Sequence, residues 1–77
     1  MAWYELVNSR DGSVREYDAE IDAVRDVIVI VSEHGPRAIE EWELDVAGDA
    51  THVTCLARGS ELAQRAMNRL GEQRRSA

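Results

Sequence analysis

Four glycine-centred breaks divide this 77-residue sequence, and the order of the segments between them constrains the fold more than any other feature. The breaks are Asp11-Gly12, Gly35-Pro36, Gly48-Asp49 and Gly59-Ser60. Alternation of polar and apolar residues indicates strands, and apolar spacings of three and four indicate helices. By these patterns the sequence predicts an α+β domain in the order ββαββα, with a four-stranded, mainly antiparallel sheet and two helices packed on one face.

The first two strands are expected at residues 3–8 and 14–17, on either side of Asp11-Gly12. This pair suits a hairpin turn because glycine adopts positive φ at no steric cost. Both a two-residue turn and a longer turn with a glycine bulge fit the sequence. The two turns place Leu6 and Val7 on opposite faces of the sheet, so the register stays open at this point.

Residues 19–34 are expected to form the first helix, with Asp18 as its N-cap. His34-Gly35-Pro36 is a strong stop, because glycine can take the left-handed cap and proline cannot continue a helix. The β-branched run at residues 27–31 is also compatible with a buried strand. The stop and start signals on both sides favour the helix.

The second half predicts another hairpin and a last helix. Apolar Trp42, Leu44 and Val46 alternate with acidic Glu41, Glu43 and Asp45, which is typical of a strand with one buried and one wet face. After a turn at Gly48-Asp49, residues 51–57 are expected to return with Val53 and Cys55 facing the core. The last helix is expected to begin at Ser60 and to end at Gly71. Residues 1–71 would then form a single domain and residues 72–77 a frayed polar tail.

The predicted core draws on both hairpins and both helices. It consists of Ile21, Val24, Ile28, Val31, Trp42, Leu44, Val46, Val53, Cys55, Leu62, Ala66, Met67 and Leu70. A core of this size supplies about 3–5 kcal/mol unless a disulfide, a metal or a partner adds to it. Because the lone cysteine cannot form an intrachain disulfide, a second copy of the chain is the expected supplement. The contact in this homodimer is expected on the Val29 and Ile30 side of the first helix or at a strand edge.

Two surfaces are predicted to make interactions. In the first helix, Val29 and Ile30 point away from the main apolar stripe, so they are expected to be covered within the chain, by a homodimer or by another protein. On the second hairpin, Glu41, Glu43 and Asp45 would lie about 6.7 Å apart on one strand face. Such a row can meet a basic protein or mimic a nucleic-acid backbone, and it can also be a solvated face that discourages aggregation.

Charge and hydropathy disfavour several classes of partner. The formal charge of −6 disfavours binding to nucleic acid and to anionic membranes. The alternative of nucleic-acid binding rests on four arginines of the last segment, Arg65, Arg69, Arg74 and Arg75, with Glu61 and Glu72 close enough to pair with the first two. The longest apolar run, residues 27–31, is far shorter than the roughly 20 residues of a membrane span. No signal peptide opens the chain, so a cytoplasmic location is expected.

Chemistry-bearing motifs are not evident in the sequence. His52 and Cys55 are three residues apart in a predicted strand, which puts them on opposite faces, so no metal and no cofactor are expected. The carboxylate pairs fall on wet faces, and so small a domain is not expected to hold a pocket of about 300 Å³. The sequence therefore predicts a small, acidic, non-catalytic protein-interaction module, a regulator or inhibitor of a basic partner. Nucleic-acid binding or mimicry and an unrecognised enzyme are the alternatives.

A resemblance supports the same fold. The motifs that carry it are Tyr17-Asp18, His34-Gly35-Pro36, Trp42-Glu43-Leu44 and Ala57-Arg58-Gly59-Ser60-Glu61-Leu62-Ala63. In these motifs the chain resembles small uncharacterised proteins of high-GC bacteria, over most of its length. The resemblance implies the α+β fold and transfers no site residue.

Overall fold

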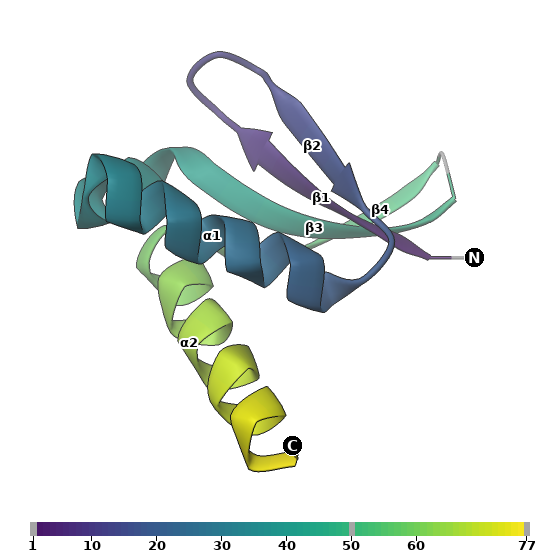
Figure 1. Cartoon of the computed structure of the whole chain (residues 1–77). Helices are drawn as coiled ribbons and strands as arrows, with labels where there is room; N and C mark the ends of the chain where they lie inside the picture. The colour runs from purple at the N-terminus through teal and green to yellow at the C-terminus, as the bar shows by residue number, and fades with distance from the viewer. Residues whose placement is uncertain (1, 50, 77) are drawn as a thin grey trace.

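The computed structural model describes residues 2–49 and 51–76, with side chains described through residue 72, and it has the predicted ββαββα order. The strands β1 (Trp3–Asn8), β2 (Val14–Tyr17), β3 (Trp42–Asp49) and β4 (His52–Arg58) form one antiparallel sheet in the order β2-β1-β3-β4. The helices are α1 (Glu20–His34) and α2 (Gly59–Ser76), with α1 running across the sheet and α2 extending away from it (Figure 1). A short 3-10 helix, η1 (Pro36–Glu41), joins α1 to β3 and was not predicted.

The first hairpin has a long turn, which settles the register. Gly12 has a φ of 76°, and its N–H donates to the carbonyl of Asn8 at 2.9 Å. The N–H of Asn8 donates to the carbonyl of Ser13 at 2.8 Å. Leu6 lies opposite Leu44 on β3, and both are fully buried beneath the helices. Leu6 is therefore the core residue, and Val7 lies on the other face.

The helix α1 includes residues 27–31, as the start and stop signals predicted. It ends at Gly35, which has a φ of 88° and donates its N–H to the carbonyl of Val31 at 2.9 Å. The prediction of Asp18 as the N-cap is wrong, because the helix begins one residue later. Ala19 occupies the cap position in an extended conformation, with no side-chain cap hydrogen bond.

The buried side of α1 is centred on Val27, and it is wider than the predicted stripe. Ala23, Val24 and Ile30 are buried beside Val27. Of the alternatives for the second apolar face, Ile30 is covered within the same chain, whereas Val29 is 46% exposed. The physical reason is that α1 packs against three neighbours, the sheet, η1 and α2, so a single sheet face does not limit its buried arc.

The helix-free face of the sheet contains residues that were predicted to be in the core. Cys55 lies opposite Asp45, and Val53 lies opposite Ala47, so both point away from the helices. Val53 is 52% exposed and Cys55 is exposed, which contradicts the prediction. The register shifts between Leu44 and Asp45, so that β4 has one extra residue there. After this irregularity Leu56 and Ala57 pack on the core instead.

The last helix is longer than predicted. It passes through Gly71 without interruption and continues to Ser76, so the predicted end at Gly71 is wrong, and Ala77 lies outside the described residues. Glycine in a helix costs about 1 kcal/mol relative to alanine but does not break the hydrogen-bond ladder. Met67, predicted in the core, is 63% exposed, whereas its neighbour Ala66 is fully buried and Leu70 further along α2 packs against the core. Met67 therefore lies on the outward side of the helix, and its exposure is not a matter of position along α2.

The rest of the core agrees with the prediction to a large extent. Val24, Trp42, Leu44, Leu62 and Ala66 are buried, and Ile21, Ile28, Val31 and Leu70 pack against them while partly exposed. Val46 is half-buried. Leu6, Ala23, Val27, Ile30, Ile39 and Ala57 complete the buried cluster and were absent from the predicted core. Among the described residues, no helix is long and apolar enough to cross a membrane.

Candidate anion-binding pocket

A cavity of about 430 Å³ opens between the β1–β2 turn, the end of α1, η1 and the start of β3. The prediction that the domain has no room for such a pocket is wrong. The cavity exists because η1 separates the end of α1 from β3 and is fastened to the β1–β2 turn. The carbonyl of Glu41 accepts the backbone N–H of Ser9 at 2.7 Å and the Ser9 hydroxyl at 3.0 Å.

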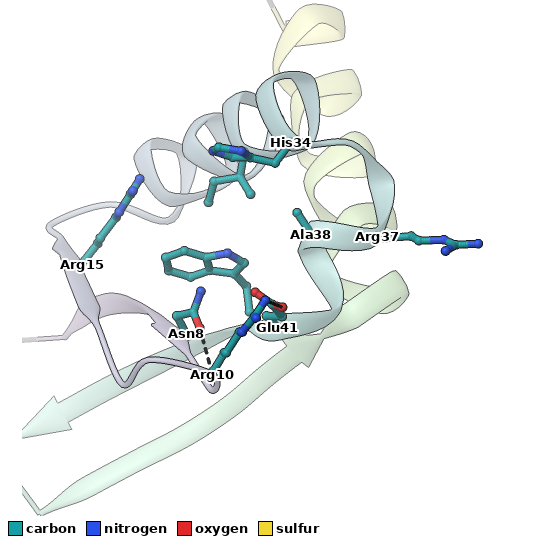
Figure 2. Close-up of a pocket in the computed structure, with 9 residues that line it drawn as sticks. Asn8, Arg10, Arg15, His34, Arg37, Ala38 and Glu41 are labelled. Carbon is teal, nitrogen blue, oxygen red and sulfur yellow. Dashed lines mark hydrogen bonds and ion pairs between the residues drawn. The ribbon is translucent and has the colours of Figure 1, made fainter.

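Basic side chains dominate the lining of this pocket. They are Arg10, Arg15, His34 and Arg37, and Glu41 is the single acidic residue among the described residues of the lining. With histidine neutral, the lining has a formal charge of +2 in a chain of −6. In Figure 2, Arg10 and Glu41 lie on one side of the cavity and His34 on the opposite side, while Arg37 extends away from it. The pocket is thus a local basic site on an acidic protein.

Arg15 is held over the apolar floor of the pocket. Its guanidinium carbon lies 5.3 Å from the centroid of the Trp42 ring, within the range of a cation–π interaction. Its Nη1 also lies 3.7 Å from Oδ2 of Asp26 on α1. The same Asp26 oxygen accepts the hydroxyl of Tyr17, whose pKa is raised by burial and by this carboxylate. Arg15 is therefore oriented from both sides before any ligand arrives.

Arg10 and Asn8 form the other half of the polar lining. Nη1 of Arg10 lies 3.2 Å from Oε1 of Glu41. Asn8 is only 7% exposed, and its Oδ1 accepts the backbone N–H groups of Arg10 at 2.8 Å and Asp11 at 3.2 Å. The amide nitrogen of Asn8 has no acceptor within the part of the chain that the structure describes, and it points toward the cavity in Figure 2. An unpaired donor that faces a cavity can be satisfied by a ligand that supplies an acceptor.

The predicted interaction residues do not come together. Ile30 and Glu41 line the pocket, and Val29 lies exposed on the outer side of α1. Glu41 belongs to η1 and not to the strand, so the predicted row of three carboxylates on one strand face is wrong. Glu43 is half-buried and Asp45 is buried on the helix-free face. Burial, and after it the neighbouring carboxylate of Glu43, together raise the pKa of Asp45 to about 6.

The arginines of the last helix are engaged in ion pairs. Nε of Arg65 lies 2.9 Å from Oε1 of Glu20, and Nε of Arg69 lies 3.1 Å from the same oxygen. Arg69 also pairs with Glu72 at 3.3 Å, as predicted, whereas Glu61 forms no ion pair with Arg65 within the described residues. The side chains of Arg74 and Arg75 lie outside the described part of the chain. Arg65 and Arg69 are therefore already paired with carboxylates, which leaves less positive charge for contacts to nucleic-acid phosphates.

The pocket residues were missed because they are far apart in the sequence. Arg10 and Arg15 flank the first turn, and His34 and Arg37 flank the second break. Their position around two glycine breaks is the signal that could have found them, since residues next to turns often gather at one end of a sheet. Comparison with protein-family models, with curated proteins and with solved structures finds no match for this chain.

Proposed function

We propose that this protein is a small, non-catalytic binding domain whose pocket takes a carboxylate or phosphate group carried on an apolar body. The observation that supports this most directly is the amide nitrogen of Asn8, which has no acceptor within the described residues and faces the cavity together with the cations of Arg10 and Arg15. Such a set of donors fits an anionic group. Trp42 and Ile30 supply the apolar contact for the body of the ligand.

The volume of the cavity supports a single small ligand. About 430 Å³ lies within the range of roughly 300–1,000 Å³ that is usual for small-molecule sites. A free carboxy-terminal group of another protein offers the same chemistry, and it would preserve the predicted role as an interaction module. In both cases the recognised group is acidic. The partner proposed for this pocket is therefore anionic, whereas the sequence alone pointed to a basic partner.

The non-catalytic proposal follows from the state of the titratable groups around the cavity. Among the described lining residues, Glu41 is the single carboxylate, and it pairs with Arg10. His34 is a largely exposed side chain near Glu33, with Nε2 at 3.9 Å from the carboxylate. A general acid or base is usually desolvated and oriented by a further group. The arrangement supports binding and orientation of an anion.

Fluorescence of Trp42 provides a direct test. In a Trp3→Phe variant, Trp42 is the single tryptophan and reports on its own pocket. We expect phenylacetate and phenyl phosphate to change this fluorescence saturably, and neutral phenylacetamide to leave it unchanged. A peptide of apolar residues with a free carboxy terminus, compared with its amidated form, tests the protein source of the same group.

Matched variants identify the residues that bind the anion. In the same background, Arg10→Gln and Arg15→Gln should each weaken binding about tenfold, because a hydrogen bond to a charged group contributes roughly 1.5–3 kcal/mol. Arg58→Gln, which removes an arginine that lines no part of this pocket, should leave affinity unchanged. Equal binding of phenylacetate and phenylacetamide, or an equal loss in all three variants, would contradict the proposal.

We also propose that the chain forms a homodimer, with β4 rather than Ile30 at the contact. Ile30 is buried within a single chain, so it cannot serve as the contact. β4 is an edge strand of the sheet, and residues 52–55 are exposed before the register shift. An exposed edge can pair with the same edge of a second copy and so extend the sheet.

A further inference from the structure

The helix-free face of the sheet brings together several carboxylates and Cys55. In the strand register, Glu5 lies opposite both Glu16 on β2 and Asp45 on β3, and Asp45 lies opposite Cys55 on β4. Like charges directly opposite one another destabilise a sheet. This row therefore has an electrostatic cost, which the hydrogen bond from Nε1 of Trp3 to Oε2 of Glu5 at 2.9 Å offsets only in part.

Three side chains of this face form a compact group of donors. One carboxylate oxygen of Glu43, one of Asp45 and the Sγ of Cys55 all lie within 4.8 Å of one another. Arg58 is the basic residue next to the group, since it lies opposite Glu43 across the strands. The three donors come from two adjacent strands, so the hydrogen-bonded ladder fixes their relative positions.

Asp45 gives an independent indication of a missing partner. Asp45 is buried, with only 8% of its surface exposed. Its Oδ1 is buried and has no hydrogen-bond partner within the described residues. Buried carboxylate oxygens are normally satisfied by a hydrogen bond, a charge or a metal ion. The position of Asp45 within the donor group points to a cation there.

We propose that Glu43, Asp45 and Cys55 bind a divalent zinc ion on the helix-free face of the sheet. Zinc accepts thiolate and carboxylate ligands together, whereas calcium and magnesium prefer oxygen ligands alone. Typical bond lengths of about 2.3 Å to sulfur and about 2.0–2.2 Å to oxygen put tetrahedral donors roughly 3.3–3.7 Å apart, so the three side chains must draw together when the ion binds. The exposed side of Cys55 gives the ion access, and water or Glu5 completes the coordination. This site is separate from the anion pocket and does not depend on it.

Binding of the zinc ion would release one proton from the protein. The thiol of Cys55 loses its proton to solvent as the zinc–sulfur bond forms, since the thiolate is the ligand. The positive ion then offsets the repulsion among the aligned carboxylates. The folded chain should therefore gain stability when zinc is present, because an ion that binds only the native state shifts the folding equilibrium.

The test uses the full chain, first treated with a chelator and kept reduced with a phosphine. Titration calorimetry with zinc should give one ion per chain, and calcium and magnesium should give no comparable signal. Cobalt, used as a spectroscopic probe in place of zinc, should show a thiolate-to-metal charge-transfer absorption. Cys55→Ser should abolish this absorption, and Cys55→Ser and Asp45→Asn should each weaken zinc binding by about tenfold or more.

Two control variants separate this site from other possible ligands. His52 forms a close pair with Asp49 on the β3–β4 turn, with Nδ1 at 2.9 Å from Oδ1, and could bind metal there by itself. We expect His52→Ala to retain full zinc affinity, and Glu16→Gln to change it little. Absence of zinc binding, loss of binding in His52→Ala, or unchanged binding in Cys55→Ser and Asp45→Asn would overturn the proposal. Circular dichroism of each variant shows that it is folded.

Discussion

At the scale of single residues, Asp45 lies in an environment that disfavours its charged form. Its pKa is raised to about 6, first by burial and then by the neighbouring carboxylate of Glu43. The folded chain therefore binds a proton at Asp45 between about pH 4 and pH 6, where the unfolded chain has released it. In the metal-free protein, stability should fall as pH rises through this range and should stay lower above about pH 6.

Asp45→Asn should remove this pH dependence, because the amide carries no charge at any pH. In the presence of a chelator, we expect the variant to be more stable than the parent by about 1–3 kcal/mol at pH 7 and to have similar stability near pH 4. Urea unfolding at several pH values measures the effect. Asp49→Asn is the matched control, because hydrogen bonds from Thr51 and His52 lower the pKa of Asp49 to about 2. A parent protein whose stability does not change between pH 4 and pH 7 would contradict this account.

At the scale of elements, α2 shows that a glycine can lie inside a helix that continues past it. Gly71 does not have the positive φ that favours glycine, and a Cβ built on it meets no atom within 4 Å. Gly71→Ala should stabilise the protein by about 0.5–1 kcal/mol, because alanine reduces the entropy of the unfolded chain and favours the helix. Thermal unfolding measures this as a rise in Tm of roughly 2–8 °C.

Gly35→Ala is the control with the opposite sign. Gly35 ends α1 at a φ of 88°, where an L side chain is strained, so this change should lower Tm even though space is available. If Gly71→Ala lowered Tm as well, the end of α2 would not be the continuous helix described above.

At the scale of the whole molecule, the small core and the exposed edge of β4 predict a homodimer. The chain has a mass of 8.6 kDa, so light scattering at increasing concentration should approach twice this value. Val53→Lys should lower the mass, because antiparallel pairing of β4 with its copy would bring like charges together across the contact. Met67→Lys changes a residue that is also exposed but lies on α2, and should leave the mass unchanged. A mass of one chain at high concentration, or no effect of Val53→Lys, would contradict the edge contact.

The sequence by itself determined the elements and their order. The glycine breaks and the apolar periodicity gave the bounds of β1 and β2, the helical state of residues 27–31 and the stop at Gly35, because these depend on backbone preferences of neighbouring residues. The same patterns identified Leu44, Val24 and Leu62 as core residues. Local signals were insufficient at Gly71, where ending the helix and continuing it differ little in free energy.

The tertiary structure alone decided which faces are buried and which residues meet. The extra residue in β4 set Cys55 opposite Asp45, and no local pattern fixes such a shift because it depends on pairing with β3. Packing of α1 against the sheet, η1 and α2 buried Ile30. The anion pocket arose in the same way, since Arg10, Arg15 and His34 are separated in sequence and meet only when η1 is fastened to the first turn. Contacts between segments distant in sequence depend on how the elements pack together, and short-range periodicity does not predict which residues will meet.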